Sequence, residues 1–297
     1  MYDVIIIGAG PAGVSASLYT QRANLKTLII YYGKSGLQKA ENIENYYGFE
    51  HGISGKDLYE LGIRQAQNIG VEVKGQEVVN VEQLINEDAR FRVTTVEGKY
   101  ESKALIFAMG NEKNRPKIKG IERFEGKGVS YCAVCDGFFY RNKDVVVLGS
   151  GNYAISEVNE LINVVKSVAI LTNGESSPEF RADNVKIETK PIEEITGKDR
   201  VEEVRFKDGT TLKTSGVFVA QGVAGSLDLA KKLGVITKNN NIVVNENMET
   251  NMQGLYACGD CVGGLLQVSK AVGDGAKAGM EAIKFIRKIH NSWKKGV

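Results

Sequence analysis

The sequence lacks several features that would place it in a specialised class of protein. Its formal net charge is only +2, too small to indicate binding to nucleic acid. No apolar run approaches the roughly 18 residues of a membrane span, so we expect no membrane segment. Met1-Tyr2-Asp3 at the start carries no basic signal-peptide region, and we expect a cytoplasmic protein. Prolines number only 4 and low-complexity tracts are absent, while 42% of the 297 residues are hydrophobic. This composition is typical of a globular chain long enough for two domains.

Cysteine is scarce, and its arrangement is informative. The 4 cysteines form two pairs with the same spacing, Cys132/Cys135 and Cys258/Cys261. The four could share one zinc ion, but the pairs lie far apart in the sequence, whereas the ligand pairs of a zinc knuckle usually lie close together. In a reducing cytosol a static disulfide is not expected, and a CxxC near a βαβ pattern is typical of a redox-active dithiol. We therefore expect no metal. For Cys258/Cys261, packing as small hydrophobic residues is favoured over a second redox centre.

The N-terminal segment has the pattern of a dinucleotide-binding fold. Residues 3–13 read DVIIIGAGPAG, an apolar strand followed by a Gly8-x-Gly10-x-x-Gly13 turn and an amphipathic helix. The glycines allow a tight turn and a close approach of the backbone to a pyrophosphate, which the helix N-terminus stabilises. A second strand follows at 27–30, but Tyr31 and Tyr32 stand where an acid usually binds the ribose.

A second copy of this pattern begins at Asp144. The segment VVVLGSGNYA contains Gly149-x-Gly151-x-x-Ala154, and another strand follows at 167–171. Two such units predict an α/β fold of two Rossmann-like, three-layer ββα dinucleotide-binding domains, with the second inserted into the first. We place the first domain at 1–111 and 246–297 and the inserted domain, which carries the CxxC, at 112–245. Residues 201–220 predict a hairpin-like pair, VRFKDGTTLK and then GVFVAQG.

In combination, these motifs resemble the low-molecular-weight thioredoxin reductases. The matching blocks, in order, are GAGPAG at 8–13, IENYYGF at 43–49, SYCAVCDGFFYRN at 130–142, NENMET at 245–250 and ACGD at 257–260. The resemblance covers essentially the whole chain. It implies a homodimeric enzyme that binds FAD in the first domain, carries the CxxC in the inserted domain and reduces thioredoxin.

The resemblance also implies the roles of the redox residues. Cys135 is the flavin-facing thiol, Cys132 exchanges with the partner disulfide, and Asp136 is the acid that protonates the leaving thiolate. A partly buried carboxyl with a raised pKa suits that role. The alternative for Asp136 is a turn residue before Gly137.

The flavin contacts follow from the same resemblance. Gly8, Gly10, Pro11, Ala12 and Gly13 are expected to form the turn that cradles the pyrophosphate. Asn45 is expected near the flavin ring and Asp260 at the ribityl hydroxyls. The other expected contacts are Tyr31, Gly36, Gln38, Val78, Ala108, Met109, Gly110, Gly259, Gln267 and Val268. The order SGLQ around Gly36 departs from the family pattern.

The second glycine motif departs from the members of the family that use NADPH. Those members hold the 2′-phosphate with a His-Arg-Arg cluster, where this chain has Thr172-Asn173-Gly174 and retains only Arg181. Each missing charge-assisted bond to phosphate costs about 1.5–3 kcal/mol. Tyr153 stands in the helix turn that is expected to face the pyrophosphate, and Leu266 replaces an arginine. The pattern is closest to the ferredoxin-dependent flavin thioredoxin reductases and predicts ferredoxin as the electron donor.

Docking of an acidic ferredoxin requires a basic surface. The segments 113–127 and 284–297 are rich in lysine and arginine, although a solvated helix end explains the second segment equally well. Two alternatives stay open. One is the same enzyme with NADPH or NADH as donor, with Glu175 holding the ribose of NADH. The other is a redox-inert flavoprotein, against which the intact CxxCD motif argues.

Overall fold

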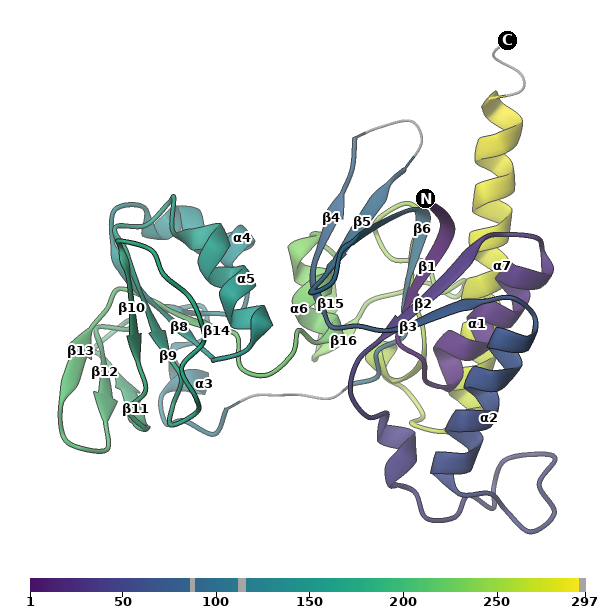
Figure 1. Ribbon diagram of the computed structural model, residues 1–297, viewed down its shortest axis with the longest axis horizontal. Coiled ribbons are helices and arrows are strands. Elements are labelled where there is room, and N and C mark those ends of the chain that lie inside the picture. Colours follow the sequence, from purple (N-terminus) through teal and green to yellow (C-terminus); the bar gives the residue numbers. More distant parts are fainter. Residues whose placement is uncertain (86–88, 112–115, 294–297) are drawn as a thin grey trace. The chain divides into compact units, whose positions relative to one another are not determined.

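The computed structural model describes residues 1–85, 89–111 and 116–293, and the chain forms two compact units (Figure 1). Unit 1 comprises Met1–Glu112 and Gly225–Val297, and unit 2 comprises Lys113–Ala224. The second unit is therefore inserted into the first. Both units contain a Rossmann-like parallel sheet with helices, so the predicted α/β fold class is confirmed.

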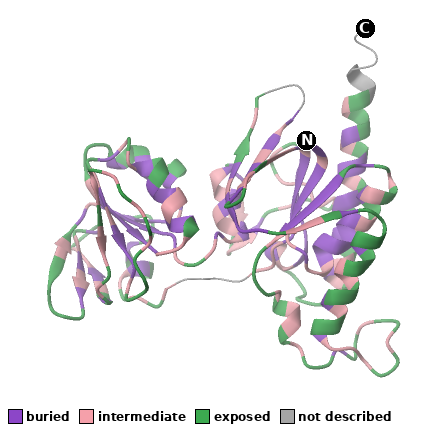
Figure 2. Cartoon of the chain, viewed as in Figure 1, coloured by how far each residue is buried: buried purple, intermediate pink, exposed green. Residues whose placement is uncertain are grey.

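The sheet of unit 1 has seven strands in the order β3-β2-β1-β6-β5-β4, with β17 also pairing with β6. Its parallel strands are β1 (Tyr2–Ile7), β2 (Thr27–Tyr31), β3 (Glu72–Gly75), β6 (Lys99–Phe107) and β17 (Leu255–Ala257). The antiparallel pairings join β4 (Val78–Gln83), β5 (Phe91–Thr95) and β6. Val4, Ile5 and Ile6 are all fully buried, and Figure 2 shows most of β1 in the colour of buried residues. Strands covered on both faces need such a continuous apolar run.

The helices of unit 1 include α1 (Pro11–Arg22), α2 (Gly55–Asn68), α6 (Ser226–Lys232) and the long α7 (Val268–Trp293). The 3-10 turns η1 (Gly36–Lys39) and η3 (Gly259–Val262) and the short strands β15 (Thr237–Lys238) and β16 (Asn241–Ile242) complete the described elements. Helices α1 and α7 pack side by side (Figure 1). A Cβ atom added to Gly275 would lie 2.0 Å from the carbonyl oxygen of Ala12, and one added to Gly279 would lie 2.7 Å from that of Ala16. Only glycine allows this approach, which fixes α7 against the start of α1.

Unit 2 contains a five-stranded parallel sheet and a separate three-stranded antiparallel sheet. The parallel sheet has the order β10 (Val185–Glu188), β9 (Ser167–Leu171), β8 (Asp144–Leu148), β14 (Val217–Val219) and β7 (Val129–Ser130). The antiparallel sheet is β11 (Ile192–Thr196), β12 (Glu203–Phe206) and β13 (Thr211–Lys213). The helical elements are α3 (Ile121–Phe124), α4 (Ala133–Asp136), η2 (Gly137–Tyr140) and α5 (Asn152–Leu161).

Two expectations about segments differ from the structure. The chain returns to unit 1 at Ala224–Gly225, before the expected boundary at 245, because α6 and β16 pack on unit 1 elements: α6 contacts β4, and β16 contacts η3. The expected strand pair at 201–220 is also different. The hairpin forms within the first run, as β12 and β13, whereas β14 joins the parallel sheet beside β8. Val217, Phe218 and Val219 are all buried, which is typical of a parallel central strand.

Candidate active site

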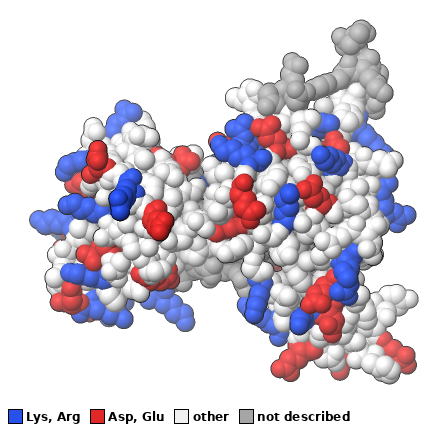
Figure 3. All heavy atoms as spheres, in the orientation of Figure 1, with Lys and Arg blue, Asp and Glu red and all other residues white. Residues whose placement is uncertain are grey.

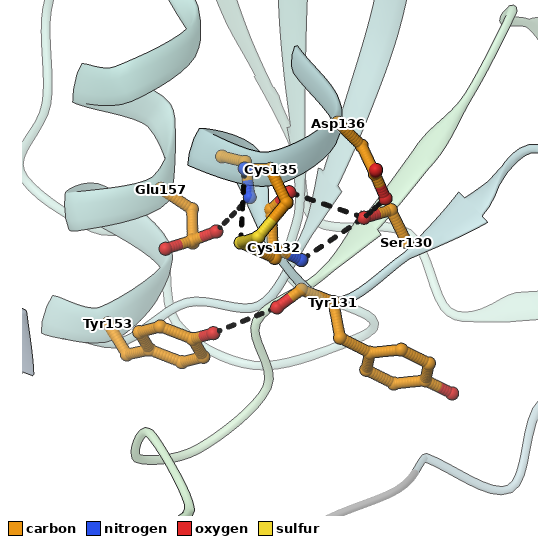
Figure 4. The surroundings of a disulfide bond; sticks show 8 residues. Ser130, Tyr131, Cys132, Cys135, Asp136, Tyr153 and Glu157 are labelled. Carbon is orange, nitrogen blue, oxygen red and sulfur yellow. Dashed lines mark hydrogen bonds between the residues drawn. A yellow bond between two sulfur atoms is a disulfide. The ribbon is translucent and has the colours of Figure 1, made fainter. Parts of the chain in front are cut away.

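Cys132 and Cys135 form a disulfide at the start of α4 in unit 2 (Figure 4). Cys132 is the N-cap residue of this short helix, and the backbone N–H of Cys135 donates a hydrogen bond to the Sγ atom of Cys132 at 3.1 Å. A donor directed at sulfur favours negative charge on that atom once the disulfide is reduced. The local structure therefore favours a thiolate at Cys132.

Asp136 is tied to the cysteine segment through Ser130. The hydroxyl of Ser130 donates to Oδ2 of Asp136 at 2.7 Å, and the Ser130 Oγ atom accepts the backbone N–H of Cys132 at 3.1 Å. Asp136 is half-buried. The carboxyl group that the sequence predicts as the acid therefore belongs to the hydrogen-bonded frame of the redox pair (Figure 4). Its role in proton transfer stays a prediction.

Cys132 and Cys135 differ in their exposure to solvent. Cys132 is only 3% exposed, whereas Cys135 is an exposed residue in this structure. The thiol expected to attack a partner disulfide is thus the buried one, and its Sγ atom must become accessible before exchange. Sequence reasoning gave no information on this difference, because the two cysteines share one short motif.

Helix α5 contacts the backbone on both sides of Cys132. The hydroxyl of Tyr153 donates to the carbonyl oxygen of Tyr131 at 3.4 Å, and the carboxylate of Glu157 accepts the N–H of Ala133 at 2.7 Å (Figure 4). Tyr153 is 1% exposed, so its ring lies in the core of unit 2. Tyr153 does stand in the first turn of α5, as the sequence predicts, but its side chain is buried and does not project from the helix end. Glu157 was missed, because a single acid on a helix carries no signal of burial.

The first glycine motif forms the tight turn that the sequence predicts. Gly8 has a φ angle of +115°, and a Cβ atom there would lie 2.2 Å from the carbonyl oxygen of Ala108. At Gly13 a Cβ atom would lie 1.9 Å from the carbonyl oxygen of Gly8. By contrast, the nearest atom to a Cβ at Gly10 is 3.8 Å away. Gly10 is also the N-cap of α1, with Pro11 as the first helical residue and no side-chain cap. An open helix N-terminus of this kind fits a phosphate group.

A second turn packs against this first one. Gly259 has a φ angle of +78°, and a Cβ atom there would lie 2.9 Å from the Cβ of Ala12. The ammonium group of Lys270 donates to the carbonyl oxygens of Gly259 at 3.0 Å and Gly263 at 2.6 Å. Asp274 accepts the N–H of Gly259 at 3.2 Å and pairs with Lys270 at 2.8 Å. These contacts hold the turn that carries Asp260.

Sequence reasoning missed Lys270 and Asp274. Their spacing of four residues on a helix is a signal for an ion pair, but it does not indicate what else the pair binds.

The structure also brings together two predicted residues from distant parts of unit 1. The side-chain amide of Asn45 donates to Oε1 of Gln267 at 2.9 Å, and Val268 begins α7 directly afterwards. Asn45 and Gln267 are both exposed. The contact places the two residues next to each other, and their position at the flavin stays a prediction.

The remaining predicted cofactor residues are distributed over several elements of unit 1. Tyr31 ends β2 and pairs in register with Gly75 at the end of β3, three positions before Val78 begins β4. The Oε1 atom of Gln38 accepts the N–H of Ser35 at 3.0 Å in the capping box of η1, which Gly36 begins. Ala108, Met109 and Gly110 follow β6 directly, and Gly110 has a φ angle of +70°. Several of these residues thus lie at the carboxyl ends of parallel strands, where α/β sheets bind ligands.

Cys258 and Cys261 are buried thiols in unit 1 that form no disulfide. Burial raises the pKa of the Cys261 thiol to about 12 and that of Cys258 well above its ordinary value. The Sγ atom of Cys261 donates to the carbonyl oxygen of Cys258 at 3.2 Å. Protonated, enclosed thiols are poor nucleophiles, so packing explains this pair better than redox chemistry. Within the ranges that the structure describes, no three potential metal-binding side chains come together.

The surroundings of the second glycine motif, Gly149–Ala154, differ from those of the first. A Cβ atom at Gly149 would lie 2.2 Å from the carbonyl oxygen of Ala220, so the tight turn is present. However, the hydroxyl of Ser150 within this turn donates to the carboxylate of Glu175, which also accepts a bond from Gln221 at 3.4 Å. A carboxylate therefore lies at the turn where a pyrophosphate would bind.

The segment that replaces the expected arginine cluster is a closed turn. Thr172 is 1% exposed, and its hydroxyl donates to the carbonyl oxygen of Glu175 at 2.7 Å. Asn173 and Gly174 have φ angles of 54° and 89°. Oδ1 of Asn173 accepts the N–H of Ile192 at 2.7 Å, which directs this side chain into unit 2. Arg181 is exposed. The turn presents no arginine to a phosphate.

Comparisons with known proteins agree with these features. The family model for pyridine nucleotide-disulphide oxidoreductases matches residues 2–275. A thioredoxin reductase of Listeria innocua is 35% identical, over 97% of this chain and 95% of that protein. The atypical thioredoxin reductase TRi of Desulfovibrio vulgaris Hildenborough has a similar structure, with a TM-score of 0.90 and 37% identity over 97% of this chain and 99% of that one. A ferredoxin-flavin thioredoxin reductase from Clostridium acetobutylicum has a TM-score of 0.69 and 34% identity over 97% and 98% of the two chains. In the part of the chain that the structure describes, no helix is long and apolar enough to cross a membrane.

Proposed function

Because the chain belongs to the pyridine nucleotide-disulphide oxidoreductase family, among the low-molecular-weight thioredoxin reductases, we propose that it reduces the disulfide of thioredoxin. The observation that carries this proposal is the Cys132–Cys135 disulfide within its frame of Ser130 and Asp136. The proposal includes a homodimeric assembly, which the family resemblance implies, and a cytoplasmic location, which the sequence predicts.

The cofactor is FAD, and unit 1 fits it. The turn Gly8–Gly13 leaves Gly10 open at the start of α1, and the turn at Gly259 packs against the same helix end. FAD supplies a carrier of two electrons, the number that a disulfide accepts. In this proposal, unit 1 binds the cofactor through its glycine turn, Asp260 holds the ribityl hydroxyls, and Asn45 and Gln267 lie at the ring.

The exchange chemistry belongs to unit 2. Two electrons and one proton break the Cys132–Cys135 bond and give the thiolate of Cys132 and the thiol of Cys135. The thiolate of Cys132 then attacks the thioredoxin disulfide, forms a mixed disulfide and releases one partner thiolate, which Asp136 protonates. Cys135 next attacks the mixed disulfide, which restores the Cys132–Cys135 bond and releases the second thiol of reduced thioredoxin.

We further propose reduced ferredoxin as the electron donor. The closed turn at Thr172–Gly174 and the Glu175 carboxylate beside Ser150 disfavour a nucleotide phosphate in unit 2. The similarity to the ferredoxin-flavin thioredoxin reductase of Clostridium acetobutylicum supports the same donor.

Exposed basic residues for ferredoxin docking are present in both units. They are Lys117, Lys119, Arg123 and Lys127 in unit 2 and Lys284, Arg287 and Lys288 on α7. Four further basic residues of the two segments, Lys113, Arg115, Lys294 and Lys295, lie outside the described residues. Basic and acidic side chains are mixed on the face drawn in Figure 3, so the docking proposal rests on these segments and not on a uniformly basic face.

One observation favours a second donor. Glu175 lies at the second glycine motif, where an acid that follows the second strand of a dinucleotide fold can bind a ribose. The alternative proposal is therefore the same reductase with NADH, and with NADPH if the missing arginines are dispensable.

A donor-free assay tests the proposed activity. Enzyme with bound FAD, reduced stoichiometrically by dithionite without oxygen, is mixed with oxidised thioredoxin, and new thioredoxin thiols are counted. We expect close to two thiols per two electrons supplied, since a disulfide takes two electrons. Release of FMN or of no flavin on denaturation would exclude the FAD assignment. Flavin that is reduced but yields no thioredoxin thiols would exclude the reductase activity.

The lysine that holds the Gly259 turn gives a prediction about cofactor retention. Lys270→Ala removes two bonds to carbonyl oxygens and the ion pair with Asp274, so the turn loses its support. Because one charged hydrogen bond is worth about 1.5–3 kcal/mol, we expect the dissociation constant of FAD to rise about tenfold or more.

Equilibrium dialysis against a series of FAD concentrations measures this change. Lys277→Ala is the matched control, since Lys277 lies on the same helix and donates to the carbonyl oxygen of Glu246 instead. Equal FAD affinity in the two variants would show that the Lys270 contacts do not support the site.

A further inference from the structure

Glu157 is a buried carboxylate at the redox pair whose presence the exchange chemistry does not explain. It is 1% exposed and lies on α5 one turn after Tyr153. Its Oε2 atom accepts the N–H of Ala133, the residue between Cys132 and Val134, at 2.7 Å. Figure 4 shows the carboxylate next to the disulfide, on the opposite side from Asp136.

Packing alone does not account for an acid at this position. The other buried side chains of α5 include Ala154, Val158 and Leu161, and an apolar residue would suit such surroundings. Burying a carboxylate costs free energy even when it accepts hydrogen bonds. A backbone N–H also has other ways to be satisfied, so the carboxylate points to an electrostatic effect on its neighbours.

We propose that Glu157 is a positioning residue of the redox centre that holds the Cys132–Ala133 peptide and, through its negative charge, makes the dithiol a stronger reductant. Together with Tyr153 it holds the backbone on both sides of Cys132. This inference rests on the proposed dithiol exchange and concerns the equilibrium of the pair, not the identity of the electron donor.

The sign of the effect follows from the charges in each state. The disulfide is neutral; on reduction the S–S bond breaks, two electrons enter, and uptake of one proton leaves a thiol and a thiolate. The N–H of Cys135, directed at the Sγ of Cys132, favours the new negative charge. The Glu157 carboxylate, bound to the Ala133 N–H, opposes this charge. A charge that raises the free energy of the reduced pair lowers its reduction potential, so the pair transfers electrons more readily to a partner disulfide.

The test measures the equilibrium between the Cys132–Cys135 disulfide and glutathione. Full-length enzyme with FAD is equilibrated without oxygen in buffers of defined reduced and oxidised glutathione, quenched with acid and alkylated. The fraction of the Cys132–Cys135 peptide in each form is then measured by mass spectrometry. Glu157→Gln keeps the size of the side chain and an acceptor for Ala133 but removes the charge.

We expect the equilibrium constant for reduction to rise about tenfold in Glu157→Gln, equivalent to about 30 mV. Glu157→Met, which is of similar length and needs no buried hydrogen bond to fold, should shift in the same direction. Tyr153→Phe is the matched control, because it removes the other α5 contact to this segment without changing charge, and should stay within twofold of the unmodified enzyme.

Two outcomes would overturn the inference. One is an equilibrium constant in both Glu157 variants within twofold of the unmodified enzyme. The other is an equal shift in Tyr153→Phe, which would show that any loosening of the segment has the same effect. If glutathione reduces the Cys132–Cys135 pair but the reduced pair never reduces thioredoxin, the proposed function is contradicted, whereas the comparison of equilibrium constants still decides the role of Glu157.

Discussion

Replacing either Cys132 or Cys135 by serine is expected to abolish steady-state reduction of thioredoxin. Each cysteine supplies one sulfur of the disulfide, and neither a serine hydroxyl nor the remaining single thiol can store the two electrons of a turnover. The assay measures the formation of thioredoxin thiols with an electron donor that reduces the unmodified enzyme. Cys258→Ala is the matched control and should retain activity, because Cys258 is an enclosed thiol with a raised pKa.

The two serine variants also separate the roles of the two thiols. We expect Cys135→Ser to accumulate a mixed disulfide between Cys132 and thioredoxin, visible as a larger species on a non-reducing gel. In Cys132→Ser, the remaining Cys135 thiolate should produce a long-wavelength absorption band beside that of the flavin. Cys132 is 3% exposed, so trapping through it also requires the segment to open. If the mixed disulfide with thioredoxin accumulates in Cys132→Ser instead, Cys135 is the exchange thiol and Cys132 the flavin-facing one. That result would agree with the exposed position of Cys135.

The donor experiment has the second large expected effect. Oxidised enzyme is mixed without oxygen with a small excess of NADPH, NADH or reduced ferredoxin, and the loss of flavin absorption is followed in time. We expect rapid reduction by ferredoxin, weakened by added salt, and slow or no reduction by either nucleotide. Hydride transfer needs a nucleotide held through its phosphates, and Thr172–Gly174 presents no arginine to them. Electron transfer from an iron–sulfur protein needs only proximity and a complementary charged surface.

Glu175→Gln distinguishes the two donor proposals by the direction of change. If the Glu175 carboxylate repels the pyrophosphate at the Ser150 turn, the variant should bind either nucleotide more tightly than the unmodified enzyme. If the carboxylate holds the ribose of NADH, the unmodified enzyme should be reduced by NADH and the variant should lose this reaction. Rapid stoichiometric reduction of the unmodified enzyme by NADPH would show that the arginine cluster is dispensable and would identify NADPH as the electron donor.

Local patterns allowed much of the architecture to be predicted. The Ile-rich run before Gly8 and the Val-rich run before Gly149 became β1 and β8, and the helices after them became α1 and α5. Both tight turns formed because only glycine tolerates the close carbonyl oxygens of Ala108 and Ala220. The strand β14 was mispredicted because an apolar run of three residues does not reveal its partner.

The sequence by itself determined the two dinucleotide folds, the redox pair and the loss of the arginine cluster, because each depends on neighbouring residues in the chain. Only the tertiary structure decided that Cys132 is buried, that Tyr153 lies in the core and that Glu157 reaches Ala133. It also decided that Asn45 meets Gln267, and that Lys270 holds the turn at Gly259. Contacts between residues that are distant in the sequence depend on the order of strands in the sheet and on how closely helices pack. The spacing of residue types along a chain specifies which face of an element is apolar, but it does not specify which distant side chains pack against that face.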